Sequence, residues 1–171
     1  MTEYQSVEFH PMYGVVGKFV MCFGELEFWV YYALGTLTDQ WYVDVAAQGL
    51  GNAIERLRKE AKRLPEPHRS QLRDELLWAK GATELRNAVI HGMWFPDLND
   101  EVYTSHRPKP LRLTVEEKAQ RTDEERKAHP KINKRFTGDQ LLETALRAGK
   151  LAGYIQVDVM RAIPGDDDDL D

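Results

Sequence analysis

Residues 84–94 read Glu-Leu-Arg-Asn-Ala-Val-Ile-His-Gly-Met-Trp and place a cation, an amide and an imidazole at the end of one predicted helix. Arg86 and His91 stand about 140° apart around such a helix, whereas Asn87 and His91 share a face at i and i+4. A long arginine side chain can reach round to join them. Arginine forks onto phosphate oxygens, and an imidazole can pass a proton to or from a ribose hydroxyl. These three residues, here called the Arg-Asn-His motif, therefore suit metal-free cleavage of RNA.

The spacing alone is not specific, because Arg63 and His68 stand at the same separation. Pro65 and Pro67 lie between them and are incompatible with a helix there. The motif differs in its context: an amphipathic run leads into it, and Gly92 stands where a helix C′ cap is expected. The alternative is structural, since an arginine, an asparagine and a histidine at a helix C-terminus can cap carbonyls and interact favourably with the helix dipole.

A long amphipathic helix is predicted from about Tyr13 to Leu37, because apolar residues recur there at alternating steps of three and four. These residues are Val16, Phe19, Val20, Phe23, Leu26, Val30, Leu34 and Leu37. Aromatic residues extend the apolar character beyond this stripe, namely Phe28, Trp29, Tyr31 and Tyr32. The second face is expected to pack either against another copy in a homodimer or inside the chain's own bundle, and the pattern leaves both open.

Glu27 lies on the same seam of this helix as Phe23 and Val30, so its carboxylate is expected to be largely buried. A buried carboxylate requires a partner. Arg86 is the predicted partner, and the pair would hold the guanidinium in place. Glu25, one step off the seam, is the alternative acid.

Three further helices follow from the same periodicity. One covers roughly Gly51 to Arg63 and ends at Pro65, and the next runs from about His68 to Gly92. The last opens at Thr137, in a capping-box sequence, and continues to about Ala162. Residues 38–50 are left unassigned.

A small β-hairpin is predicted between the last two helices. Short strands are expected at 93–95 and 102–104 around a turn, with 111–113 as a possible third piece. Residues 114–135 carry no clean periodicity and are expected to be a polar excursion. The predicted fold class is therefore all-α: a bundle of four or five helices with a small β-hairpin and a basic loop inserted before the last helix.

One domain is expected from the length of 171 residues, spanning 1–165 with an insert at about 96–135. The apolar stretches are too short and interrupted to span a bilayer, and the N-terminal residues lack the basic region of a signal peptide. A cytoplasmic location with no membrane association is the expectation. The single cysteine, Cys22, lies in the first helical pattern and is interpreted as a packing residue.

The formal net charge of −5 comes from residues 166–171, which hold five aspartates and are expected to form a disordered, solubilising tail. Residues 105–135 carry a local excess of cations over acids. Such an excess is compatible with binding an RNA backbone, although a solvated loop accounts for it equally. The candidate RNA-binding residues are Arg107, Lys109, Arg112, Lys131, Lys134 and Arg135.

Metal and nucleotide chemistry find no support in the spacing of the residues. The five histidines are scattered, without a His-Glu-x-x-His pattern or paired cysteines. No glycine-rich loop follows a predicted strand, because Gly14, Gly17 and Gly24 fall within the first helix. Neither a metal nor a cofactor is expected.

The chain resembles the HEPN superfamily, the "higher eukaryotes and prokaryotes nucleotide-binding" domains. The resemblance is carried by Arg86-Asn87-Ala88-Val89-Ile90-His91-Gly92, which fits the family's Arg-Asn-x-x-x-His form. It also covers the order of a long first helix with an acid, a motif helix and a closing helix after an insert. These common elements span roughly residues 13–95 and 136–162, and the insert matches no pattern of the family.

The resemblance implies a metal-independent endoribonuclease that acts as a homodimer, with both copies of the motif in one composite cleft. His91 would be the general acid/base for attack by a ribose 2′-oxygen, and Arg86 would stabilise charge on the phosphorane. Asn87 would orient His91 or hydrogen-bond the phosphate. Glu27, or alternatively Glu25, would be the acidic residue that the family carries on its first helix. Family members act in toxin–antitoxin systems and antiviral defence, so an antitoxin or other regulatory protein is a further expected partner.

Some family members are inactive, which leaves a second hypothesis. The chain would then be a non-catalytic helical module that binds a protein partner through its aromatic first helix.

Overall fold

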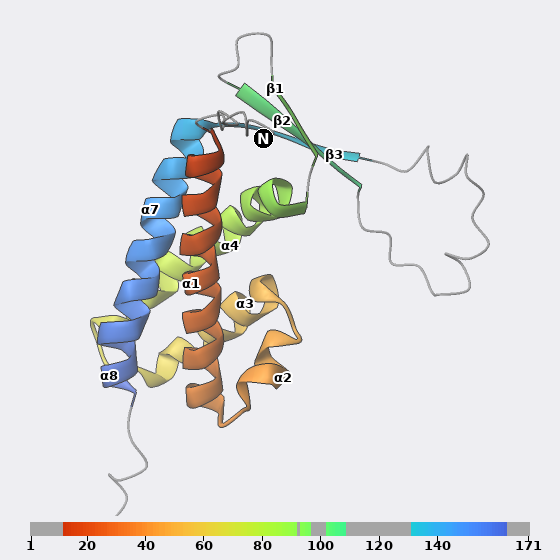
Figure 1. Cartoon of the computed structure of the whole chain (residues 1–171). Helices are drawn as coiled ribbons and strands as arrows, with labels where there is room; N and C mark the ends of the chain where they lie inside the picture. The colour runs from red at the N-terminus through yellow and green to blue at the C-terminus, as the bar shows by residue number, and fades with distance from the viewer. Residues whose placement is uncertain (1–11, 92, 97–101, 109–130, 164–171) are drawn as a thin grey trace, which may run out of the picture. The chain divides into compact units, whose positions relative to one another are not determined.

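The computed structural model describes residues 12–91, 93–96, 102–108 and 131–163 (Figure 1). The chain divides into two compact units. The first contains the described residues up to Arg86 and those from Gly138 onward, and the second runs from Asn87 to Thr137. The predicted acidic tail and most of the predicted insert lie outside the described residues.

Helices make up the first unit. In the N-terminal half of the chain they are α1 (Met12–Thr38), α2 (Tyr42–Ala46), α3 (Leu50–Glu60), the 3₁₀ turn η1 (Ala61–Arg63) and α4 (His68–His91), of which residues 68–86 belong to this unit. After the sheet follow α7 (Gly138–Tyr154), the π-helical turn η2 (Ile155–Val159) and α8 (Met160–Ala162). The four predicted helices are thus confirmed. The unassigned segment contains α2, which is too short to show a helical period.

The core of this unit forms around α1, which packs against α7 and α3, and Figure 1 shows α1 and α7 running side by side. Phe19, Phe23 and Leu26 of α1 are almost completely buried, as the apolar stripe predicts. Cys22 lies against α7, where a Cβ added to Gly149 would be 3.5 Å from its Sγ. Burial, followed by the charge of Glu25, raises the pKa of the Cys22 thiol, which agrees with a packing role.

Ion pairs join α4 to its neighbours within the first unit. Lys80 Nζ of α4 donates to Glu55 Oε2 of α3 at 2.5 Å, and Arg58 Nη2 donates to Glu55 Oε1 at 2.9 Å. These hydrogen bonds, first that from Lys80 and then that from Arg58, lower the pKa of the Glu55 carboxyl from 4.5 to about 2. Because the folded chain favours the ionised form, the carboxylate stabilises the fold above pH 4.5, and this contribution is lost as the pH falls toward 2.

We expect Glu55→Gln to flatten the acid limb of the stability profile. The variant lacks the ionised carboxylate, so its free energy of unfolding should fall less steeply than that of the wild type between about pH 5 and pH 3. Urea unfolding at a series of pH values measures this slope. Glu143→Gln, at an exposed position on α7, is the control. Equal slopes for the wild type and Glu55→Gln would contradict the prediction.

The second unit contains a three-stranded antiparallel sheet of β1 (Met93–Pro96), β2 (Val102–Pro108) and β3 (Lys131–Thr137), in that order. The predicted hairpin is confirmed as β1 and β2, in which Met93 pairs with His106. The prediction of a polar excursion is wrong for residues 131–135, which belong to β3. A lysine at 134 interrupts the alternation of Ile132 and Phe136, which conceals the period of two. Residues 111–113 lie outside the described residues.

The described part of the chain is mostly helical, with five α-helices of five or more residues and a small sheet before α7. This agrees with the predicted helical bundle and its β insert. None of the helices in this part has the length and apolar character needed to cross a membrane.

Candidate functional site

Glu27 and Arg86 form an ion pair between α1 and α4, as the sequence predicts. Arg86 Nη2 donates to Glu27 Oε2 at 2.8 Å, and Tyr31 Oη donates to Glu27 Oε1 at 2.6 Å. Glu25 is exposed, so the choice between the two acids falls on Glu27. Each carboxylate oxygen of Glu27 therefore accepts a hydrogen bond, and the carboxylate is held in one orientation against the guanidinium.

The pair is mostly buried, in line with the expectation for Glu27, since the side chains of Arg86 and Glu27 are 20% and 26% exposed. Glu27 lies one turn after the buried Phe23 and one turn before the buried Tyr31. Burial, and next the hydrogen bond to Glu27, raises the pKa of the Tyr31 hydroxyl, so it remains a donor. Sequence reasoning did not identify Tyr31 as a site residue, although its i, i+4 spacing from Glu27 is a usable signal.

We expect Glu27→Gln to reduce stability by about 1–3 kcal/mol, because the amide keeps only one of the two acceptor oxygens and removes the negative charge that faces Arg86. Urea unfolding of the single variants and of the double variant with Arg86→Gln measures the coupling between the two residues. Glu25→Gln, two residues away and exposed, is the matched control and should change stability by less than about 0.5 kcal/mol. Equal effects of the two substitutions, or no coupling to Arg86, would contradict the pairing as a source of stability.

The Arg-Asn-His motif lies on a single α-helix, because α4 continues without interruption to His91. Asn87 is half-buried and His91 is exposed, while the intervening Ala88 and Val89 are buried. Asn87 and His91 thus keep the predicted i, i+4 relation. The predicted cap residue, Gly92, lies outside the described residues.

Four of the six candidate RNA-binding residues lie in the sheet, Arg107 in β2 and Lys131, Lys134 and Arg135 in β3. Lys109 and Arg112 lie outside the described residues. In the register, Arg107 pairs with Ile132 and Arg135 pairs with Thr104. Because strand positions alternate between faces, positions 107 and 134 belong to one face of the sheet and positions 131 and 135 to the other. The strands therefore do not collect the four cationic positions on one face.

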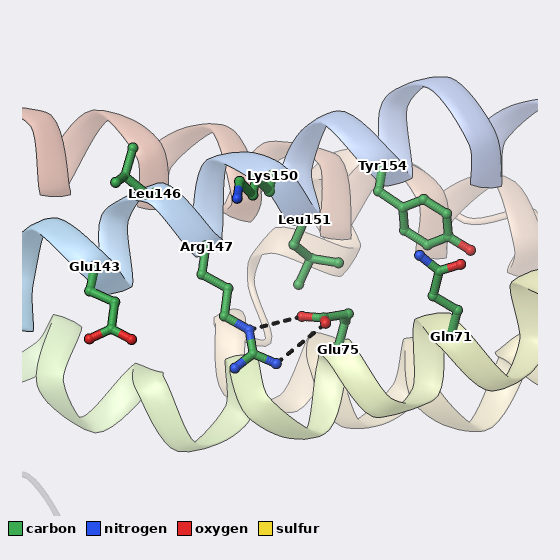
Figure 2. A pocket seen from close by; sticks show the side chains of 8 residues that line it. All are labelled: Gln71, Glu75, Glu143, Leu146, Arg147, Lys150, Leu151 and Tyr154. Carbon is green, nitrogen blue, oxygen red and sulfur yellow. Dashed lines mark hydrogen bonds and ion pairs between the residues drawn. The ribbon is translucent and has the colours of Figure 1, made fainter.

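A groove of about 480 Å³ lies between α4 and α7 in the first unit, and Figure 2 shows the side chains that line it. Arg147 crosses it and donates to both carboxylate oxygens of Glu75 at 3.2 and 3.3 Å, and its guanidinium stacks 4.4 Å from the centre of the Trp78 ring. At the edge of the groove, the Tyr154 hydroxyl lies 3.1 Å from His68 Nδ1. Two acids and two cations line the groove, so it carries no excess charge. Its lining residues are Gln71, Glu75, Glu143, Leu146, Arg147, Lys150, Leu151 and Tyr154.

Aromatic side chains gather on the surface where α1 meets α2. Phe28 and Tyr32 are stacked with ring centres 6.0 Å apart, and Tyr42 lies 5.7 Å from Phe28. All three are more than a third exposed, and the neighbouring Trp41 is 81% exposed. Among the predicted aromatic residues Phe28, Trp29, Tyr31 and Tyr32, Tyr31 alone is buried in the core. Phe28, Tyr32, Trp41 and Tyr42 are called the aromatic surface below.

Comparison with models of known protein families, with curated proteins and with solved structures gave no significant match. In the described ranges, no three His, Cys, Asp or Glu side chains gather in a group that could hold a metal ion. The chemistry that the arrangement offers is that of a fixed guanidinium, with an amide and an imidazole farther along the same helix. A guanidinium of this kind binds phosphate oxygens, and an imidazole transfers protons.

Proposed function

We propose that this chain is a metal-independent endoribonuclease of the HEPN type. The observation that supports it is the ion pair between Arg86 and Glu27, because it joins the two residues assigned from the family resemblance. A helix that continues from Arg86 through His91 is consistent with the same assignment.

In the proposed mechanism, His91 takes the proton of a ribose 2′-hydroxyl and the 2′-oxygen attacks the adjacent phosphorus. The bond from phosphorus to the 5′-oxygen breaks, giving a 2′,3′-cyclic phosphate and a 5′-hydroxyl. His91 of a second copy supplies the proton to the leaving oxygen in a homodimer. Arg86 stabilises the charge of the phosphorane, and Asn87 orients His91 or hydrogen-bonds the phosphate. Tyr31 holds the Glu27 carboxylate, Glu27 holds the guanidinium, and neither takes a proton.

Unrestrained cleavage of cellular RNA would harm the cell that makes the protein. We therefore propose a role as a toxin or antiviral effector that a regulatory protein holds inactive.

The test is cleavage of a mixed cellular RNA pool by the purified protein in EDTA. We expect the wild type to cut and to leave cyclic phosphate ends, and we expect Arg86→Ala to lose this activity while remaining folded by circular dichroism. Absence of cleavage by the wild type in the presence and absence of metal, or equal cleavage by the variant, would overturn the assignment.

The aromatic surface favours a second candidate function, a non-catalytic module that binds a protein partner. Exposed apolar clusters of this kind mark interaction sites in soluble proteins. In that case Tyr32→Ser would abolish the cellular effect of the protein, and His91→Ala would leave it intact. The catalytic proposal predicts that His91→Ala abolishes the effect.

A further inference from the structure

A second groove, of about 400 Å³, is lined by four cations and no acid: Arg58, Lys59, Lys62 and Arg73. It belongs entirely to the first unit, with Arg58 and Lys59 on α3, Lys62 on η1 and Arg73 on α4. We call it the basic groove. None of its residues was among the candidates from the sequence.

The helical period explains why the cations gather. Arg58 and Lys62 stand four residues apart and Lys59 and Lys62 three apart, so all three share one side of α3 and η1. The other side carries Leu57, Ala61 and Leu64, which are completely buried. Burial of this apolar side fixes the rotation of the helix and turns the three cations outward. Arg73 joins them from α4.

Arg58 is the most constrained member of the groove. Its Nη2 is held by Glu55, which is shared with Lys80, and its side chain is only 31% exposed. Its Nε is buried and has no hydrogen-bond partner among the residues that the structure describes. A buried donor without a partner is costly, and four like charges around one hollow repel one another. A bound anion would relieve the repulsion among the four cations.

We propose that the basic groove binds the phosphate backbone of single-stranded RNA and holds the substrate of the nuclease. This inference rests on the proposed function. Four cations from two helical segments around one groove match a ligand with several charges better than a single anion. No aromatic side chain lines the groove, so it offers contacts to phosphates without stacking on bases, and binding is independent of sequence.

The test measures binding of a fluorescently labelled, mixed-sequence RNA of about 20 nucleotides by anisotropy, in the full chain with His91→Ala so that RNA stays intact. Each phosphate contact contributes about 0.7 to the slope of log K against log salt for single strands. The triple variant Lys59→Gln, Lys62→Gln, Arg73→Gln should therefore flatten the slope by about 2.1. The ratio of the RNA affinity of the parent protein to that of this variant therefore falls about 20-fold between 50 and 200 mM salt.

A matched triple variant removes the same charge elsewhere: Lys18→Gln, Lys150→Gln and Arg161→Gln, all at exposed positions. It should keep the slope of the parent protein. An equal loss of slope in both triple variants, or none in the groove variant, would overturn the proposal, as would binding of anionic lipid vesicles in place of RNA. RNA binding that depends on the groove in a chain without RNase activity would uphold the groove and reject the nuclease. If the wild type cleaves RNA and the groove substitutions change neither cleavage nor binding, the nuclease would be upheld and the groove rejected.

Discussion

Replacing His91 by alanine is expected to lower the rate of RNA cleavage by about 10²–10⁴-fold, the usual contribution of a positioned general acid or base. The imidazole is the group that moves protons in the proposed mechanism, and alanine leaves none in its place. Because His91 is exposed, its loss should have little effect on folding. Single-turnover cleavage of a short RNA in EDTA measures the rate, with urea unfolding of each variant in parallel.

His68→Ala is the matched control, since it removes the same residue type from the other end of α4. This variant loses the contact with Tyr154 but should keep the cleavage rate. Arg86→Lys adds a second comparison, because lysine keeps the charge and loses the fork that engages two phosphate oxygens. We expect it to cleave slowly. Equal rates for His91→Ala and His68→Ala would refute the catalytic role of His91.

Replacing Phe23 by alanine is expected to reduce the free energy of unfolding by about 3–5 kcal/mol. The ring is 1% exposed and packs on Phe19 with centres 4.7 Å apart, so truncation leaves a cavity beside a second aromatic ring. Urea unfolding monitored by circular dichroism gives the difference. Met21→Ala, two residues away and 69% exposed, should change stability by no more than about 0.5 kcal/mol.

The Phe23 variant also tests whether packing in the core supports the Glu27–Arg86 pair. Phe23 stands one turn before Glu27, so loosening this part of α1 should weaken the hold of Glu27 on Arg86. We expect the coupling energy between Glu27 and Arg86 to be smaller in the Phe23→Ala background. A loss of stability in Phe23→Ala no larger than that in Met21→Ala would contradict the packing of α1.

The need of Glu27 for a cationic partner was predictable from its own helix, although Arg86 lies 59 residues away in the sequence. Glu27 occupies a position of the apolar seam, a charge at such a position needs a counter-charge, and Arg86 was the candidate chosen. Tyr31 was missed because an aromatic residue in an apolar helix was counted as core, without regard to its hydroxyl.

The sheet shows where pattern reasoning fails for another reason. β1 and β2 carry their own turn signal, whereas β3 pairs with β2 across a long separation in sequence and has Lys134 between its two apolar residues. Its pairing with β2 is non-local, so neither a turn signal nor a clean alternation near β3 predicts it. The same register divides the cationic positions between two faces, which a count of charges along the chain does not show.

The sequence by itself determined the positions of the long helices, the placement of the Arg-Asn-His motif on one of them, and the partner of Glu27. Helical periodicity is a property of neighbouring residues, so it can be read before the chain folds, and a carboxylate on the apolar seam requires a cation wherever that cation lies in the sequence. Only the tertiary structure decided that Tyr31 completes the ion pair and that Arg58, Lys59, Lys62 and Arg73 line one groove. Arg73 belongs to a different helix from the other three, and packing within the first unit is what brings their charges together.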